Sequence, residues 1–416
     1  MPKLLRTDHI FIWFDNDMRV LHLVTSPLGG AGIASRRINQ ALLNIGIDSK
    51  LMYGGRNYKS AKNEILLERK RSEKFLSSSN TIIQRYLIQK GKNPITTISL
   101  NIIDDWNNIV NKFDVIHVHS LYNLTNISSL KPLLDSEKKI VFTLHDQRLF
   151  TGGCHYSFGC NNYMDICSEC PQVRFYAKDL VKREHLRASQ IFRNLSNIQI
   201  VSPSIWLMNL AKQSEMLKNL EIHHVNNPIP EPSIASQSCD NPTIWRHAIP
   251  RHRIGFVAAD LSNPNKGLKT LLSAMETIDF DKRENYQLEL IGRGKIPDIP
   301  KGFQVNVIQD ANEETVQRSL KKIDLIVVAS GLDNSPNIIG ESLMAGTSVV
   351  GSKTGGISEL LNFFNMPTFE VGNSNELSRI IRTFNWNYER SKITEKARIK
   401  FNYDTIAKKY LNIYMN

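Results

Sequence analysis

Residues 323–359 read IDLIVVASGLDNSPNIIGESLMAGTSVVGSKTGGISE, and this stretch switches from strand signals to helix signals and back. Residues 323–329 form an apolar run rich in β-branched side chains, and residues 347–351 form a second, shorter one. The Asn-Ser-Pro-Asn loop of residues 334–337 is typical of a helix start, with Ser and Asn as expected capping residues, and Gly346 is typical of a helix end. The stretch therefore predicts a strand, a helix over about residues 338–345 and a second strand.

The loop before the predicted helix suits a phosphorylated, polyhydroxylated ligand. Backbone amides at a helix start attract phosphate, so Asn334, Ser335 and Asn337 are predicted ligand contacts. Glu341, one turn into the helix, is expected to accept hydrogen bonds from sugar or ribose hydroxyls, and Asp333 precedes the loop. The alternative is that two acids occur in one βαβ crossover by chance.

Asp333 and Glu341, with seven residues between them, resemble the acidic signature of retaining glycosyltransferases of the GT-B fold, family 4 type (glycosyl transferases group 1). That family has Glu at both positions. The resemblance implies an α/β protein with two Rossmann-like, doubly wound domains facing a cleft and a C-terminal helix crossing back. It also implies a UDP- or GDP-sugar donor, no catalytic metal, Asp333 on the donor hydroxyls and Glu341 on the ribose.

Strand-like runs alternate with amphipathic stretches along the whole chain, which favours parallel α/β sheets. In the first half we predict strands at residues 19–25, 50–53, 115–119, 139–144 and 199–202, and a helix at 34–45. In the second half we predict strands at 253–258, 286–291, 304–307, 325–329 and 348–351, a helix at 268–277 and a helical tail at 397–414. Residues 56–100 are interpreted as an insertion with helical parts.

These patterns and the family resemblance together divide the chain into five expected parts. They are an N-terminal appendage (1–17), an acceptor-side Rossmann-like domain (18–224), a Pro- and Ser-rich linker (225–250), a nucleotide-sugar donor domain (251–395) and a C-terminal crossover helix (396–416).

Length, composition and charge limit the classes of protein to which this chain can belong. With 416 residues, 41% hydrophobic and 22% charged, the chain is long enough for two globular domains. No run approaches the ~18 apolar residues of a membrane span, and residues 4–14 are too short, and lack the cleavage site, for a signal peptide. The net charge of +12 comes from scattered Lys and Arg, which fits an anionic membrane surface, an anionic substrate or plain solubility better than nucleic acid.

Two further loops carry candidate phosphate contacts. Gly29 and Gly30, in PLGGAGIA (27–34), would let backbone amides approach a ligand at a helix start, although a tight turn explains them equally well. Lys266, in DLSNPNKGL (260–268), is expected to neutralise a diphosphate. The family pairs this Lys with an earlier Arg that is missing here, and Arg293, at another strand end, is the predicted substitute.

Histidines follow two of the predicted strands. His117 and His119 point to the same face of one strand, but a metal site would need a third ligand, so a structural role is the simpler interpretation. His119 and His145 both stand at carboxyl ends of strands, where open α/β sheets bind ligands. The family resemblance places His145 toward the donor sugar and His119 on the acceptor side.

Four cysteines, Cys154, Cys160, Cys167 and Cys170, are spaced C-x5-C-x6-C-x2-C. Three interpretations stay open: a structural zinc site, of which C-x2-C is a usual half, independent thiols, and disulfides, which need an oxidising compartment. The loop resembles the Cys-rich loop of a family 4 subgroup that builds exopolysaccharides of the colanic-acid type, and we expect it to shape the acceptor pocket.

The sequence thus predicts a retaining glycosyltransferase of bacterial cell-surface polysaccharide synthesis. It is expected to be cytoplasmic and peripheral at the inner face of the plasma membrane, with a lipid-linked saccharide acceptor and no nucleic-acid partner. The alternatives are an inverting GT-B transferase, a nucleotide-sugar epimerase, or a non-catalytic sugar- or zinc-binding protein that has decayed from an enzyme.

Overall fold

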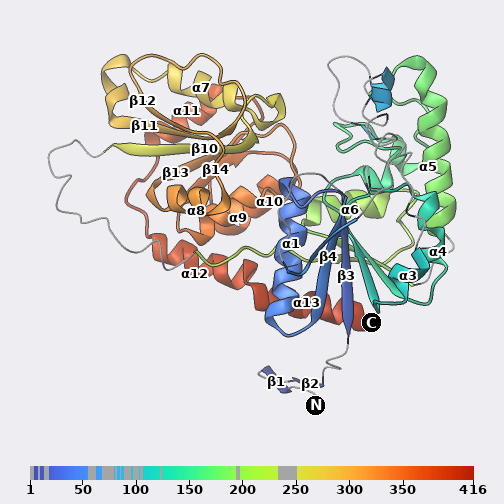
Figure 1. Ribbon diagram of the computed structural model, residues 1–416. Coiled ribbons are helices and arrows are strands. Elements are labelled where there is room, and N and C mark those ends of the chain that lie inside the picture. Colours follow the sequence, from blue (N-terminus) through green and yellow to red (C-terminus); the bar gives the residue numbers. More distant parts are fainter. Residues whose placement is uncertain are drawn as a thin grey trace. The chain divides into compact units, whose positions relative to one another are not determined.

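The computed structural model describes residues 18–54, 62–67, 106–121, 124–193, 197–232 and 251–416, two short strands before residue 18 and scattered positions between 79 and 103. Most of the predicted insertion, the linker after residue 232 and Cys239 lie outside the described residues. The chain divides into unit 1, Met1–Pro228 with Tyr403–Asn416, and unit 2, Ile229–Asn402. Each unit is a parallel sheet packed against helices, as predicted (Figure 1).

Unit 1 is built on a seven-stranded parallel sheet with the order β5-β4-β3-β6-β7-β8-β9. The strands are β3 (Arg19–Val24), β4 (Asp48–Tyr53), β5 (Glu64–Leu66), β6 (Val115–Val118), β7 (Lys139–Thr143), β8 (Ile198–Ser202) and β9 (Ile222–His224). The chain leaves β3 toward β4 on one side and later returns to β6 on the other. The strand order therefore reverses between β3 and β6.

The helices of unit 1 with described bounds are α1 (Gly29–Asn44), α3 (Trp106–Val110), α4 (Lys131–Leu134), α5 (Lys178–Arg193), α6 (Ile205–Gln213) and α13 (Tyr403–Met415). Apolar side chains of α1 and α13, among them Ile38, Leu42, Ile406 and Tyr410, share one buried cluster with Val20 of β3. The last helix of the chain is thus part of the core of the first unit.

Unit 2 has a six-stranded parallel sheet with the order β12-β11-β10-β13-β14-β15. Its strands are β10 (His252–Asp260), β11 (Tyr286–Arg293), β12 (Gln304–Ile308), β13 (Leu325–Val328), β14 (Ser348–Ser352) and β15 (Thr368–Phe369). Its helices are α7 (Leu268–Glu276), α8 (Glu313–Lys322), α9 (Asn337–Met344), α10 (Gly355–Phe364), α11 (Ser374–Thr383) and α12 (Arg390–Phe401). Here the strand order reverses between β10 and β13.

Several elements differ from the prediction. The tail is two helices rather than one, because the backbone of Asn402 leaves the helical region (ψ 138°) and separates α12 in unit 2 from α13 in unit 1. Helix α1 begins at Gly29, five residues earlier than predicted. The edge strands β5, β9 and β15 have two or three residues each, too few for a periodic signal. Residues before 18 include an antiparallel pair, β1 (Leu4–Thr7) and β2 (Ile10–Trp13).

Among the described residues, no helix combines the length and the apolar character that crossing a membrane requires.

Candidate functional site

The first candidate site lies in unit 2, at the reversal of strand order between β10 and β13. In open α/β sheets this is where a crevice forms beyond the carboxyl ends of the strands. The 3₁₀ turn Pro264–Lys266 follows β10, and the loop before α9 follows β13. The predicted donor residues Lys266, Asp333 and Glu341 all belong to these two segments.

Lys266 and Asp333 form an ion pair between these two segments. The Lys266 Nζ donates to Asp333 Oδ2 at 2.7 Å, and the Asp333 side chain is 13% exposed. Asn265 fixes the two loops to each other, because its Nδ2 donates to the Leu332 carbonyl at 3.0 Å and its Oδ1 accepts from the Leu332 amide at 3.2 Å. The structure therefore joins two residues that the sequence assigned separately to the diphosphate and to the sugar.

Two glycines allow the loops to approach this closely. Gly267 has a φ of 78°, and a Cβ there would lie 2.0 Å from the Ala329 carbonyl oxygen. Gly355, with a φ of 51°, would place a Cβ 2.3 Å from the Asp333 carbonyl oxygen, which also accepts from the Gly356 amide at 3.1 Å. Any other residue at either position would push the loop that carries Asp333 out of place.

Two helix starts meet the Asp333 loop without a side-chain cap. Helix α9 has Pro336 at the cap position and α10 has Thr354, and neither makes a side-chain capping hydrogen bond. The residue at the cap position of α9 is therefore Pro, which has no side-chain acceptor, rather than Ser or Asn. The amide end of a helix carries a partial positive charge that favours anions, although at the start of α10 the Gly356 amide already donates to the Asp333 carbonyl.

The other predicted ligand contacts around α9 differ in their exposure to solvent. Asn334 is buried, whereas Ser335, Asn337 and Glu341 are partly exposed. Glu341 lies one turn into α9, next to the buried Gly340 and Ser342.

Arg293 does not join this ion pair. It ends β11, where its carbonyl oxygen accepts from the Leu261 amide at 2.6 Å, but its guanidinium pairs with Asp310 on an exposed surface. Its predicted role as a substitute phosphate contact stays a prediction.

The second candidate site lies in unit 1, at the reversal between β3 and β6. Gly29 and Gly30 are the first residues of α1, whose start has no side-chain cap, and a Cβ at either would meet nothing within 4 Å. Gly32 is different, because a Cβ there would lie 2.3 Å from the Ser26 carbonyl oxygen. Gly29 and Gly30 therefore leave open space at a helix start, whereas Gly32 serves packing.

Four histidines, which lie in or just after the neighbouring strands β3, β6 and β7, form one cluster in this unit. His22 Nδ1 lies 2.9 Å from His119 Nε2, and His119 Nδ1 lies 3.1 Å from His145 Nε2. His117 bonds through both ring nitrogens, to the Tyr414 and Thr143 hydroxyls, each at 2.7 Å. The sequence singled out His117, His119 and His145 but missed His22 and Tyr414. The signal for His22 was a single histidine inside the apolar strand RVLHLV.

Burial keeps these histidines neutral. It lowers the pKa of His22 to about 3 and that of His145 to about 4, the latter against the opposing charge of Asp146. Burial, together with the neighbouring imidazoles, holds the pKa values of His117 and His119 well below their usual range. At neutral pH the cluster can donate and accept hydrogen bonds but carries no charge.

Asp146 links this cluster to the cysteine-rich loop. Its Oδ2 lies 2.7 Å from His155 Nδ1, and its Oδ1 accepts from the Arg148 amide at 2.9 Å. Burial alone would raise the pKa of Asp146, but His155 and the Arg148 amide outweigh it and lower the pKa overall.

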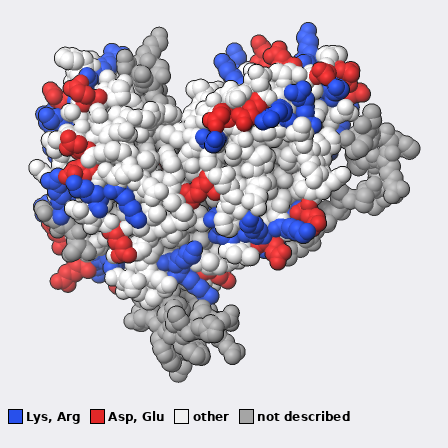
Figure 2. All heavy atoms as spheres, turned by 180° about the vertical axis from the view of Figure 1, so that it is seen from behind, with Lys and Arg blue, Asp and Glu red and all other residues white. Residues whose placement is uncertain are grey.

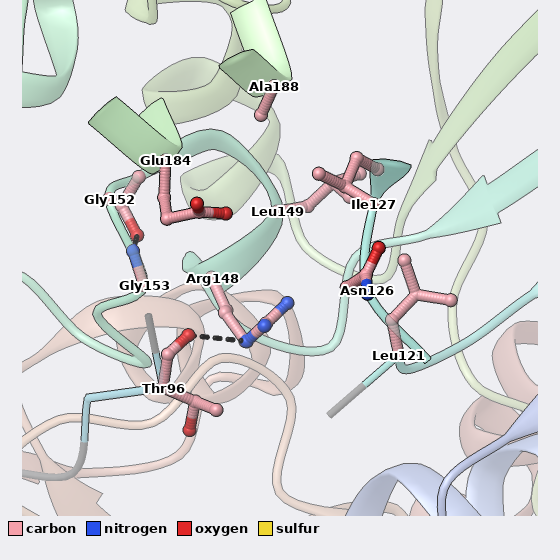
Figure 3. A pocket seen from close by; sticks show the side chains of 11 residues that line it. Thr96, Leu121, Asn126, Ile127, Arg148, Leu149, Gly152, Gly153, Glu184 and Ala188 are labelled. Atoms are coloured by element: carbon pink, nitrogen blue, oxygen red, sulfur yellow. Dashed lines mark hydrogen bonds between the residues drawn. The ribbon is translucent and has the colours of Figure 1, made fainter. Parts of the chain in front are cut away.

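A cavity of about 50 Å³ opens where this loop begins. Figure 3 shows Arg148 and Glu184 directed toward it, with Arg148 Nε donating to the Thr96 carbonyl at 3.1 Å. The backbone of Gly152 and Gly153 forms another part of its wall. The Cys loop thus borders a small cavity in unit 1, and its expected place at an acceptor pocket stays a prediction.

The four cysteines of the loop are free thiols, so its structure contains no disulfide between them. Cys154 accepts from Gln172 Nε2 at 3.2 Å, and Cys167 accepts from the Gly152 amide at 3.3 Å. A hydrogen bond between Cys154 and Cys170 raises the pKa of Cys154 and lowers that of Cys170 to about 6, while burial raises that of Cys167 to about 12. Thiol protons are thus shared unequally within the loop.

Within the described part of the chain, His22, His117 and His119 form the one set of three or more possible metal ligands whose ligand atoms lie within 4.8 Å of one another. The cysteines do not reach this spacing, although zinc–sulfur bonds of about 2.3 Å would require it. The zinc site therefore stays a prediction.

Part of unit 2 is similar to a known enzyme family. Residues 251–383, most of unit 2, match the family described as glycosyl transferases group 1. The WcaC protein of Escherichia coli strain K12, named for a glycosyl transferase of colanic acid biosynthesis, is 25% identical over 320 residues, which span 73% of this chain and 76% of WcaC. The protein is a glycosyltransferase.

Solved structures show the fold of this glycosyltransferase. Sucrose-phosphate synthase from Thermosynechococcus elongatus superposes with a TM-score of 0.66 at 14% identity, over 96% of this chain and 98% of the synthase. HepE of Anabaena, solved in complex with UDP-glucose, superposes with a TM-score of 0.57 at 14% identity, over 95% and 98% of the two chains. The predicted GT-B fold is confirmed.

Proposed function

We propose that this glycosyltransferase transfers a sugar from a nucleotide-diphosphate sugar, with retention of the anomeric configuration, to a saccharide acceptor in exopolysaccharide synthesis. The observation that carries the proposal is the Lys266–Asp333 ion pair between two uncapped helix starts. It offers a cation and amides to a diphosphate, next to a carboxylate that can accept from sugar hydroxyls. HepE, solved with UDP-glucose, and WcaC support the donor class and the pathway.

In this mechanism Lys266, Asp333 and Glu341 have separate roles. The Lys266 ammonium has three hydrogens, and since Asp333 takes one, two are left for diphosphate oxygens. The charge that develops on the leaving diphosphate is stabilised by Lys266 and by the amides at the starts of α9 and α10. Asp333 accepts from donor hydroxyls and Glu341 from the ribose.

The chemical step needs no protein nucleophile. The bond from the anomeric carbon to the β-phosphate oxygen breaks, the acceptor oxygen forms its bond on the same face, and the departing phosphate oxygen takes the acceptor's proton. NMR of the product distinguishes this reaction from its alternatives, because an inverting transferase would give the opposite anomer and an epimerase would give no transfer product.

The first test of the donor site is a thermal-shift panel of nucleoside diphosphates and their sugars, UDP- and GDP-sugars included. A ligand at a hundred times its Kd adds about 2.7 kcal/mol of stability. We expect one base to give a selective rise that Lys266→Ala and Glu341→Ala both abolish. Lys269→Ala is the matched control, since Lys269 is exposed three residues further along the same segment. Absence of any shift with folded protein would contradict the proposal.

We further propose that the acceptor is lipid-linked and that unit 1 meets the anionic inner face of the plasma membrane from the cytoplasm. Phe175 and Tyr176 are 86% and 62% exposed, and they precede α5, which has five Lys or Arg residues against two acids. Aromatic rings beside basic residues suit a membrane interface. On the face drawn in Figure 2, Lys and Arg are interspersed with Asp and Glu.

Vesicle binding tests the membrane proposal. Vesicles with anionic lipid should bind the protein at low salt and release it as salt rises, and Phe175→Ser should weaken binding. Phe280→Ser is the control, because Phe280 is 69% exposed on unit 2. Partition that does not depend on salt would contradict an electrostatic contact.

A further inference from the structure

The Cys loop, residues 151–172, buries most of its thiols and exposes two of its large apolar side chains. Cys154, Cys167 and Cys170 are 6%, 7% and 4% exposed, whereas Phe158 and Met164 are 43% and 38% exposed. The structure describes every residue of this loop, and its one helical element is the 3₁₀ turn at residues 162–164. A segment with so little core of its own usually depends on disulfides or a metal ion for a fixed conformation. The buried thiols are therefore the groups that can hold this loop in place.

Hydrogen-bond donors are directed at three of the four sulfurs. The Gly152 amide donates to Cys167 Sγ at 3.3 Å, and Gln172 Nε2 donates to Cys154 Sγ at 3.2 Å. The backbone amide of Gln172 donates to Cys170. The sulfur of a neutral thiol is a weak acceptor, whereas a thiolate is stabilised by such donors and is the form that binds metals. These three sulfurs are thus in surroundings that favour thiolates.

Thiolates placed so close together need a cation. The pKa of Cys154 is raised by its hydrogen bond with Cys170, by burial and by the charges of the other two cysteines of the loop. Cys154 is therefore within electrostatic reach of all three. Lys178 acts on Cys170, but its ammonium is paired with Glu169. Because buried negative charges without a counter-charge are costly, a bound divalent cation would stabilise this group of sulfurs.

The spacing of the sulfurs suits zinc for one pair and requires a movement of the other two. Tetrahedral zinc with bonds of about 2.3 Å holds its sulfurs about 3.8 Å apart, a separation that hydrogen-bonded thiols such as Cys154 and Cys170 also have. No three of the four sulfurs lie within 4.8 Å of one another, so the ion would draw Cys160 and Cys167 inward. Cys160 is partly exposed and follows Gly159, where a Cβ would meet nothing within 4 Å. The turn before Cys160 therefore has room to move.

The set of His22, His117 and His119 is less suited to a metal ion, although its ligand atoms lie within 4.8 Å of one another. His22 Nδ1 and His119 Nε2 are 2.9 Å apart, which is shorter than the about 3.4 Å between two nitrogens bound to tetrahedral zinc. Both ring nitrogens of His117 face hydroxyls, those of Tyr414 and Thr143, at 2.7 Å. These are hydrogen-bond distances, so we expect zinc at the cysteines instead.

The contacts of the Cys loop show what an ion there would hold in place. Cys154 pairs with Ile95 in an isolated antiparallel bridge, and Val173, directly after the loop, pairs with Ile88 in another. The backbone of residues 152–153 forms part of the wall of the cavity of about 50 Å³. An ion bound to Cys154 would therefore fix this wall and its contact with an earlier part of the chain.

We propose that Cys154, Cys160, Cys167 and Cys170 bind one zinc ion as four thiolates, in a closed structural site that holds the Cys loop in place. Each thiol loses its proton to solvent as the ion binds. Four protein ligands fill the tetrahedron and leave no position for a substrate, so the ion takes no part in the transfer step. The site lies wholly in unit 1, and its existence does not depend on the proposed function.

Elemental analysis of the purified full-length protein, expressed with zinc in the medium, tests this site. We expect about one equivalent of zinc per chain, lowered at least about tenfold in Cys154→Ser and in Cys170→Ser. Cys239→Ser removes the fifth cysteine of the chain and is the matched control, which should keep its zinc. Wild-type protein without zinc overturns the proposal, and so does zinc that His22→Leu removes and Cys170→Ser retains.

Cobalt loading and thiol alkylation of the wild-type protein give the answer even if a serine variant does not fold. The cobalt-loaded protein should show thiolate-to-cobalt charge-transfer absorption, which a site of histidines alone would lack. Alkylation followed by mass spectrometry should spare the four cysteines until a chelator is added, with no reductant needed. Alkylation without a chelator would indicate independent thiols, and alkylation that needs a reductant would indicate disulfides. Either result overturns the proposal.

Hydrogen exchange shows whether the ion holds the loop. We expect chelation to speed exchange at least about tenfold in residues 151–173 and to leave residues 251–383 of unit 2 unchanged. Exchange in the Cys loop that stays the same after the zinc is removed would overturn the structural role of the ion.

Discussion

Both units place a candidate site where the strand order reverses, between β3 and β6 in unit 1 and between β10 and β13 in unit 2. The unit 1 site is lined by neutral, mostly buried imidazoles that bond to one another. The unit 2 site contains an ion pair whose lysine is partly exposed. The difference follows from solvation: a charge is costly where water is excluded and cheaper where water or a charged ligand can reach it.

The largest expected difference between the two units is in how much folding stability each loses as the pH falls. In unit 1, burial lowers the pKa values of His22, His117, His119, His145 and His185, whereas in unit 2 it lowers that of His252. The unfolded chain has histidine pKa values near 6.5, so below that pH it binds more protons than the folded chain. Stability is therefore fully present above pH ~6.5 and is lost as pH falls, by about 1.4 kcal/mol per pH unit for each such ring until its folded pKa is reached.

Hydrogen exchange read by mass spectrometry, corrected for intrinsic exchange rates, can follow each unit between pH 7 and pH 5. We expect protection in the β3–β6–β7 region of unit 1 to fall well before that in the β10–β13 region of unit 2. His22→Leu should make the pH dependence of unit 1 shallower. If protection fell equally with pH in both units, the expected difference between their histidines would be contradicted.

The next largest expected difference is in the loss of stability when a glycine at each site is replaced by alanine. Gly267→Ala should lower the free energy of unfolding by about 3 kcal/mol, because its Cβ would lie 2.0 Å from the Ala329 carbonyl oxygen at a φ of 78°. Gly30→Ala should change it by less than about 0.5 kcal/mol, since its Cβ meets nothing. Urea unfolding measures both. A large stability loss in Gly30→Ala would show that the start of α1 is packed rather than open to a ligand.

Asp333→Glu tests how far unit 2 has departed from the usual acidic pair. Asp333 is engaged by Lys266, and a longer side chain could reach a donor hydroxyl while it keeps that partner. We expect kcat/KM to rise up to about tenfold, since small changes in positioning have large effects on rate. Asp333→Asn, which removes the charge, should lower it. If Asp333→Glu and Glu341→Ala leave the protein equally inactive, a decayed enzyme is the better description.

Two tyrosine hydroxyls with protein partners, one in each unit, should show the smallest difference between the units. Tyr414 bonds to His117 in unit 1, and Tyr388 donates to the Asp324 carbonyl at 2.6 Å in unit 2. Tyr414→Phe and Tyr388→Phe should each cost about 1 kcal/mol in unfolding free energy. Only Tyr414→Phe should also perturb the NMR signals of His117. A cost near zero for Tyr414→Phe would mean that water or Thr143 replaces the lost bond.

The sequence by itself determined the parallel α/β architecture, most strand and helix positions, and the acids, lysine and histidines at strand ends. These are local properties, since a strand or helix shows its period within a few residues and a strand end is where polar residues follow an apolar run. The same local reasoning missed the edge strands and the break at Asn402, because elements of two or three residues and a single change in ψ leave no periodic trace.

Only the tertiary structure decided which of these residues meet. Lys266 and Asp333 are 67 positions apart and His22 and His119 are 97 apart, so their contacts depend on which strands are neighbours and in which register. The sequence did not indicate His22 as a site residue, because its neighbours in β3 form an apolar run. It joins the histidine cluster because His22 pairs with His117 in the register of β3 and β6. The sequence therefore gives the residue types, whereas the packing of strands that are distant along the chain determines which residues become hydrogen-bond partners.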